Sequence, residues 1–201
     1  MASNTRTTKL ESINTMLSTI GEAPVNSLTG TLPTDATMAI NILDEVNREV
    51  QSQGWKFNSS YKVTLTRDTN NKIPIGNDVM HIEFNHLREN RSSYDPVLRG
   101  SFLYNLVDES FVWDKNFDNV RVIFLIPFED AIEQARRFIT IRASRIFHDR
   151  TLGANALHRF SQQDELRALS FLKQAEASTA DHNIFNSLDQ FKTVSRNMLL
   201  K

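Results

Sequence analysis

The hydrophobic period of this chain changes twice along its length, and that change limits the folds open to it. Apolar residues recur every three to four positions before residue 58, alternate with polar residues between 60 and 126, and resume the longer spacing after 128. The outer patterns predict amphipathic helices and the middle one predicts half-buried strands. The sequence therefore predicts an α+β fold: an antiparallel helical bundle formed by N- and C-terminal helices, with a central β-rich meander.

Two helices are expected in residues 1–58. The first ends at Gly21, a residue suited to a left-handed C-terminal cap, and Pro24 blocks its continuation. The second begins at the capping residues Thr34 and Asp35 and ends at Gly54. The expected apolar faces are Leu10, Ile13, Leu17 and Ile20 in the first helix, and Ala36, Ala39, Ile40, Leu43, Val46 and Val50 in the second.

Residues 60–126 are expected to form the β-rich insertion. The predicted strands cover residues 61–66, 79–84, 102–106, 111–113 and 120–126. The polar, turn-rich segment from His86 to Gly100 is predicted to be an exposed loop. Pro127 is expected to end the sheet because proline cannot donate to a strand ladder.

A second helix pair is expected in residues 128–180. Its first helix runs from Glu129 to His148, with acidic residues near its start and basic residues near its end, and Gly153 separates it from a helix over residues 154–180. Residues 181–201 are either a short amphipathic helix or an arm that orders on a partner. We expect residues 1–201 to form a single domain from these four segments.

Composition excludes several classes of protein. The 201 residues carry 23 basic and 24 acidic side chains, so the chain does not hold nucleic acid by net positive charge. Because there is no cysteine, disulfides, thiolate catalysis and cysteine zinc sites are excluded. No segment is apolar and long enough for a signal peptide or a membrane span, so we expect no membrane association.

Few residues suggest catalysis or metal binding. The chain has no GxGxxG, GxxxxGK, HExxH or GxSxG motif. His81 and Glu83 share one face of a predicted strand and His86 follows, which would supply three metal ligands, but a solvated strand face explains them as well. We therefore expect no catalytic residue, no metal and no cofactor.

The densest basic group lies in the third predicted helix. Its five arginines are Arg136, Arg137, Arg142, Arg145 and Arg150. They would contact DNA phosphates or acidic patches on a neighbouring subunit if they point outward. Alternatively, they complement the helix dipole and pair with acidic residues of the same chain. Both interpretations stay open at this point, and the arginines are candidate interface residues.

Apolar side chains outside the expected core are further interface candidates. In the polar C-terminal segment these are Phe185, Leu188, Phe191 and Leu199. Trp55, Phe57 and Trp113 are alternatives, because aromatic residues often anchor interfaces. For Trp55 and Phe57, which follow a helix end, we favour burial in the core.

Three blocks of sequence resemble the tail tubular protein A family of short-tailed bacteriophages. The turn at residues 20–25 (IGEAPV) is similar to the family's turn after the first helix, and Gln51, Gly54-Trp55 and Phe57-Asn58 resemble the end of its second helix. Ala143-Ser144-Arg145 and the segment up to Gly153-Ala154 resemble its third helix. The blocks keep their order over residues 8–185, and the β region resembles the family least.

The resemblance implies a structural virion protein of the head-to-tail connector, in the neck of a particle assembled in the host cytoplasm. Members of the family form a dodecameric ring between the portal protein and the tail nozzle (tail tubular protein B), with tail fibres attached. Double-stranded DNA leaves the head through the ring without sequence-specific binding. The family is not defined by catalytic residues, so the resemblance adds none.

One alternative function stays open. Phage tails sometimes carry proteins that cut polysaccharides, and a glycoside hydrolase needs only two suitably spaced carboxylates. With 24 acidic residues such pairs arise by chance, so the sequence contains nothing specific for a tail-associated polysaccharide hydrolase.

Overall fold

The computed structural model describes residues 6–84, 94–153 and 155–179, the last range with its side chains from 162 to 178. Helices and strands both occur, as the α+β prediction requires. The helices are α1 (Lys9–Thr19), α2 (Thr34–Gln51), α3 (Glu133–Leu152) and α4 (Asn155–Thr179), with short 3-10 turns η1 (Lys56–Asn58) and η2 (Phe128–Asp130). The strands are β1 (Ser59–Leu65), β2 (Val79–Glu83), β3 (Pro96–Arg99), β4 (Phe102–Asn105) and β5 (Phe117–Phe124).

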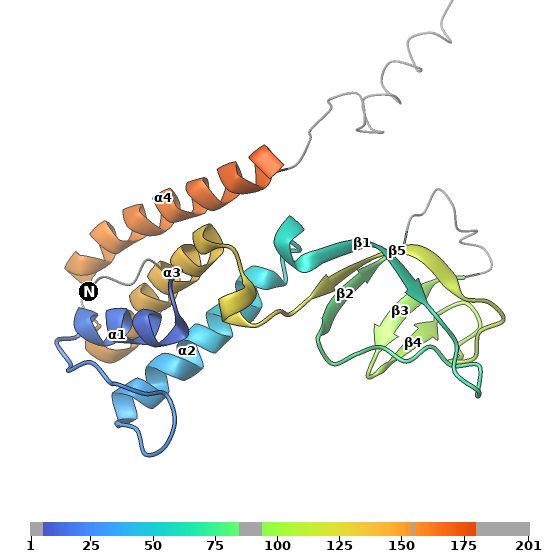
Figure 1. Ribbon diagram of the computed structural model, residues 1–201, viewed down its shortest axis with the longest axis horizontal. Coiled ribbons are helices and arrows are strands. Elements are labelled where there is room, and N and C mark those ends of the chain that lie inside the picture. Colours follow the sequence, from blue (N-terminus) through green and yellow to red (C-terminus); the bar gives the residue numbers. More distant parts are fainter. Residues whose placement is uncertain (1–5, 85–93, 154, 180–201) are drawn as a thin grey trace, which may run out of the picture.

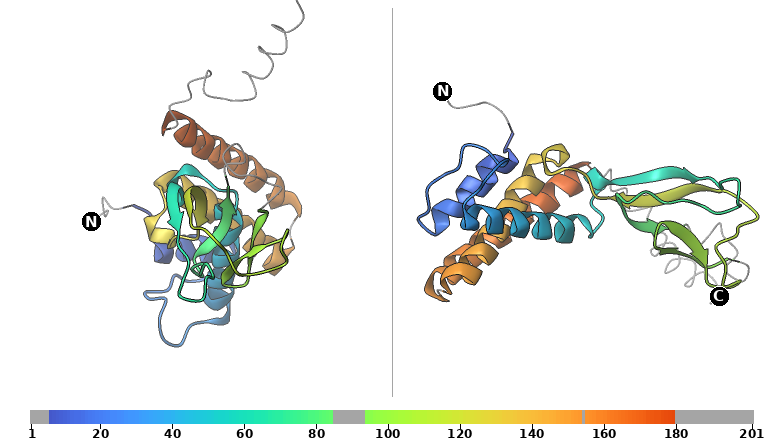
Figure 2. Two further views of the ribbon diagram at one scale, coloured as in Figure 1. Left: turned by 90° about the vertical axis from the view of Figure 1, so that its right-hand side faces the viewer. Right: turned by 90° about the horizontal axis from the view of Figure 1, so that it is seen from below.

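The elements form two parts that lie end to end (Figure 1). We call α1–α4 the helical lobe and β1–β5 the β lobe. The strands lie beyond the end of α2, as the right-hand view of Figure 2 also shows. Each lobe has a hydrophobic core of its own, because no residue of the helical cluster belongs to the β cluster.

Helix α3 is at the centre of the helical lobe. Its buried residues Phe138, Ile139 and Phe147 share one core with residues of α1, α2 and α4. Helices from both ends of the chain thus bury their apolar faces together. Helix α1 begins at a capping box in which Thr8 and Glu11 each bond the other's backbone N–H, and it ends before Gly21, whose φ of +79° fits the predicted left-handed cap.

The β lobe is not a simple meander, so that prediction was wrong. The first sheet has the order β1-β5-β2, with both pairs antiparallel, and β3 and β4 form a separate hairpin. Strand β5 takes the central position because Val120, Val122 and Ile123 are its most β-prone residues and all three are buried. Strand β5, the last of the five strands in the sequence, therefore lies between β1 and β2.

Two further expectations in this region need correction. The segment expected to be a loop up to Gly100 contains β3, whose four residues pair with β4 in regular register; residues 85–93 lie outside the described residues. Residues 111–113, expected to be a strand, form only an isolated bridge at Val112. Trp113 is instead held as a core residue, with its indole N–H donated to the Leu103 carbonyl at 3.0 Å.

The predicted helix starts also differ from the structure. Helix α2 begins at Thr34 itself, after Pro33, with no side-chain cap. Helix α3 begins at Glu133 rather than Glu129, because Ala131 and Ile132 are extended and the Arg136 side chain bonds the carbonyls of Glu129 and Ala131. Gly153, with a φ of +63°, ends α3 as predicted.

Buried polar groups join the two lobes. The Gln51 side chain, fully buried, bonds both backbone groups of Ile126, and Asn58 Nδ2 donates to the carbonyls of Gln51 and Phe124 at 2.8 Å each. Arg121 of β5 donates to the carbonyl of Gly54 at 2.8 Å. We call these five groups, Gln51, Gly54, Asn58, Arg121 and Ile126, the joint. They tie the segment that enters the β lobe to the segment that leaves it.

Candidate functional site

The five arginines of α3 do not form one basic surface. Arg136 is 3% exposed, and its guanidinium donates to the carbonyls of Thr7, Glu129 and Ala131. A guanidinium presents several donors in a fixed plane, so one side chain serves three backbone acceptors. Arg136 therefore fixes the turn before α3 and the chain before α1, and it is not available to a partner.

Arg142 and Arg145 converge on one buried carboxylate of α4. Glu165 is 9% exposed; it accepts from Arg142 and, at 2.5 Å, from Nε of Arg145. Arg142 also forms a two-bond pair with Glu49 of α2. The Glu49 and Glu165 carboxylates raise the pKa of Arg142 above its ordinary value. These pairs hold α4 and α2 against α3.

Arg150 pairs with Glu45 of α2 through two bonds of 2.9 and 3.0 Å. This hydrogen-bonded pair lowers the pKa of the Glu45 carboxyl and raises that of Arg150. Both side chains are about half exposed, so the pair is screened by solvent. It marks the outer edge of the contact between α2 and α3.

Arg137 is the exception among the five. It is exposed, and no hydrogen bond or ion pair joins it to another residue in the described part of the chain. Two hollows of the surface share it: one of about 530 Å³ between α3 and α4, lined also by Phe171 and Ser178, and one of about 470 Å³ towards α1, lined also by His148 and Asp164. We call the two hollows together the Arg137 groove.

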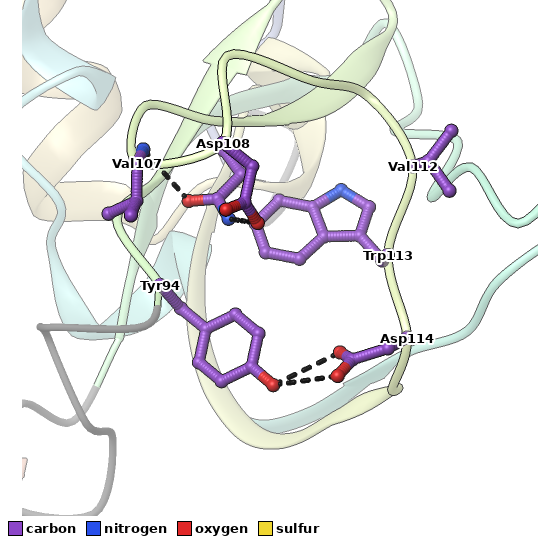
Figure 3. A pocket seen from close by; sticks show the side chains of 7 residues that line it. Tyr94, Val107, Asp108, Val112, Trp113 and Asp114 are labelled. Carbon is purple, nitrogen blue, oxygen red and sulfur yellow. Dashed lines mark hydrogen bonds between the residues drawn. The ribbon is translucent and has the colours of Figure 1, made fainter.

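The β lobe carries a third hollow, of about 480 Å³ (Figure 3). Two carboxylates line it: Asp114 accepts from the Tyr94 hydroxyl at 2.9 Å, and Asp108 accepts from the Asn105 amide at 2.7 Å. Trp113 is 2% exposed, with Tyr94 stacked on it, and the Lys115 ammonium lies 3.9 Å from the Tyr94 ring centre. Because these ring faces are covered, the hollow offers no open aromatic face on which a sugar could stack.

Of the three possible metal ligands, the structure describes two. Glu83 bonds Arg121 at 2.8 Å, His81 is exposed on β2, and His86 lies outside the described residues. Within residues 6–84, 94–153 and 155–179, no group of three or more His, Asp or Glu side chains is placed to hold a metal ion.

The remaining interface candidates divide between the core and the undescribed tail. Trp113 is a core residue of the β lobe, and Trp55 and Phe57 are partly buried against the helical core. Phe185, Leu188, Phe191 and Leu199 lie outside the described residues. None of the helices within the described ranges is apolar over a length that would cross a membrane.

Sequence reasoning missed the joint. Gln51, Gly54 and Asn58 belong to one of the blocks that resemble the phage family, but nothing in the helical or alternating pattern indicates that they bond one another and residues 121–126. The available signal was a glutamine on the apolar face of a predicted amphipathic helix. A side chain at that position would be buried, and buried amide groups require hydrogen-bond partners.

Comparison with known proteins identifies the family. No curated protein matches the chain. A family model described as tail tubular protein matches residues 10–182, which include the joint, both lobes and all five arginines of α3. With this match over most of its length, the chain belongs to the tail tubular protein family, the structural proteins of phage tails.

Proposed function

We propose that this chain is the ring-forming adaptor that joins the portal protein to the tail nozzle (tail tubular protein B) and the tail fibres. The family match over residues 10–182 carries the proposal. In it, the whole chain acts as one adaptor domain, twelve copies form a closed ring in the neck of the virion, and neighbours meet head-to-tail, because unlike surfaces must meet when a ring closes.

The elongated arrangement of two lobes supports this role. A connector between two assemblies needs separate surfaces at its two ends, and the helical and β lobes, each with its own core, lie at opposite ends of the molecule (Figure 1). The buried bonds of the joint favour a fixed angle between the lobes. We propose that the helical lobe forms the antiparallel bundle of the ring, and that the β lobe faces the nozzle and the fibres.

The charges of the chain suit a conduit for double-stranded DNA. The formal net charge is −1, and four of the five arginines of α3 bond acceptors within the chain. Each phosphate contact would add to the affinity for DNA and slow its passage. We propose that DNA passes through the ring without sequence-specific binding, with assembly completed in the host cytoplasm.

Imaging tests the proposal. Purified portal mixed with this chain, viewed by single-particle electron microscopy, is expected to show rings of twelve copies on the tail side of the portal. The chain should occupy the neck of the virion in tomograms. Its presence only at fibre tips, or its absence from the neck, would contradict the proposal.

We also propose that the chain works without catalysis. Replacing Asp108 or Asp114 by asparagine, which removes the carboxylates of the β-lobe hollow, should leave infectivity unchanged as long as the protein folds. Turnover of a capsular polysaccharide that one of these changes abolished, in rings that still form, would establish a hydrolase instead.

A further inference from the structure

The Arg137 groove has the features of a surface that another chain covers. Phe171, at the α4 side, is 59% exposed although α4 buries other apolar residues such as Leu172. Arg137 lies in both hollows with no acceptor among the described residues, whereas Glu133 at its rim accepts from Thr7. An exposed aromatic ring beside an unpaired guanidinium is typical of binding anchors.

The second hollow adds polar groups to the groove. His148, 8% exposed, forms part of its wall towards α1. Asp164, exposed at the same hollow, supplies a negative charge.

The order of groups along the groove is therefore aromatic, basic, acidic: Phe171 in the first hollow, Arg137 shared by both, and Asp164 in the second. The C-terminal segment contains the complementary order at helical spacing. Phe185, Asp189 and Lys192 are separated by four and three residues, which would place an aromatic, an acidic and a basic side chain on one face of a helix.

We infer that the Arg137 groove receives residues 184–192 of a second copy of this chain, as a helix laid in a groove. Phe185 packs on Phe171, Asp189 pairs with Arg137, and Lys192 pairs with Asp164. The choice of a second copy rests on the proposed ring, because a segment and a groove are unlike surfaces and join copies head-to-tail.

Disulfide trapping tests the inference in full-length chains, because the natural sequence has no cysteine. A chain with Phe171→Cys is mixed with a size-tagged chain with Phe185→Cys, and the intermolecular disulfide is followed on non-reducing gels. Leu166→Cys is the matched control, since Leu166 is on the same helix and 61% exposed but does not line the groove. The Phe171 pair is expected to form its disulfide several-fold faster than the Leu166 pair.

Charge reversal adds a second readout. In the Phe171→Cys chain, Arg137→Asp is expected to slow trapping roughly tenfold, because it replaces a charge-assisted pair by repulsion between like charges. Asp189→Arg in the partner chain is expected to restore the rate. Arg48→Asp, which reverses an exposed arginine of α2, should have no effect.

Equal trapping of the Phe171 and Leu166 pairs would overturn the inference. So would an intramolecular disulfide in a chain that carries both Phe171→Cys and Phe185→Cys, because the segment would then fill its own groove. If trapping fails while rings still form on the portal, this inference is wrong and the adaptor proposal stands. If trapping succeeds and the neck lacks the chain, the adaptor proposal is wrong instead.

Discussion

The Gln51 side chain makes the same pair of bonds to Ile126 that two strands would make, although 75 residues separate them. Its Oε1 accepts from the Ile126 N–H and its Nε2 donates to the Ile126 carbonyl, each at 2.9 Å. Because Gln51 ends α2 and Ile126 follows β5, this amide fixes where the chain leaves the helical lobe relative to where it returns.

Replacing Gln51 by leucine should therefore destabilise the folded protein. The change leaves the partly buried N–H and C=O of Ile126 without their side-chain partners, and we expect the unfolding free energy to fall by roughly 2–4 kcal/mol. Urea denaturation followed by circular dichroism measures it. Gln53→Leu, at an exposed position two residues away, is the control and should change stability by less than about 0.5 kcal/mol. Equal effects of the two changes would contradict the role of the joint.

Gly54→Ala tests the close approach of the two lobes. Gly54 has a φ of +73°, and a Cβ there would lie 2.4 Å from Cδ1 of Ile123. Gly21 has a similar φ of +79° with open space around it. Both alanine variants should lose about 1–2 kcal/mol from the left-handed backbone, and Gly54→Ala should lose roughly 1 kcal/mol more from the collision. Ile123→Val, which removes the colliding atom, should reduce that excess in thermal melts.

The geometry of Arg136 makes lysine a poor substitute. Lysine keeps the charge but loses the planar donors that reach three carbonyls, so Arg136→Lys should lower the unfolding free energy by about 2 kcal/mol. Arg137→Lys, at the next residue, is the matched control because Arg137 is exposed. Chemical denaturation of both variants measures the difference. If Arg136→Lys does not change the free energy of unfolding, a positive charge alone is sufficient at this position.

Glu165→Gln should loosen α4. The amide cannot accept from Arg142 and Arg145 as a carboxylate does, so two partly buried guanidinium groups lose a partner. We expect a loss of roughly 1–3 kcal/mol and faster amide hydrogen exchange in residues 162–178. Asp164→Asn, at an exposed position, should change neither quantity. Exchange that rose equally in both variants would refute the assigned role of Glu165.

The Glu45–Arg150 pair predicts a dependence on pH. The pKa of Glu45 is lower in the folded protein than its usual 4.5, so its contribution to stability is present above the usual pKa and is lost as the pH falls through the folded pKa. The melting temperature of Glu45→Gln should be lower than that of the natural protein at neutral pH, and the two should converge in acid. Because both groups are exposed, high salt should also reduce the difference in melting temperature between Glu45→Gln and the natural protein. A difference that persists in acid and salt would exclude the ion pair as its cause.

The pattern of the sequence determined which segments became helices and where most of them end. Leu10, Ile13 and Leu17 recur on one face of a helix, and only glycine adopts the left-handed backbone at Gly21 and Gly153 without strain. These are local effects, set by neighbours within a few residues. The same local reasoning failed at Trp113, where burial of the indole against Leu103 and Phe117 overrides an extended run that resembles a strand.

Only the tertiary structure decided which strands pair and where each arginine points. Strand order depends on contacts between distant segments, so the insertion of β5 between β1 and β2 leaves no periodic signal. The arginines of α3 look alike in sequence, yet Arg136 is buried against backbone carbonyls, whereas Arg137 is exposed in a groove and bonds no residue in the described part of the chain. Their partners, such as Glu165 and Glu49, come from other helices, and a charge can be assigned to a pair or to a surface only when the packing of those helices is known.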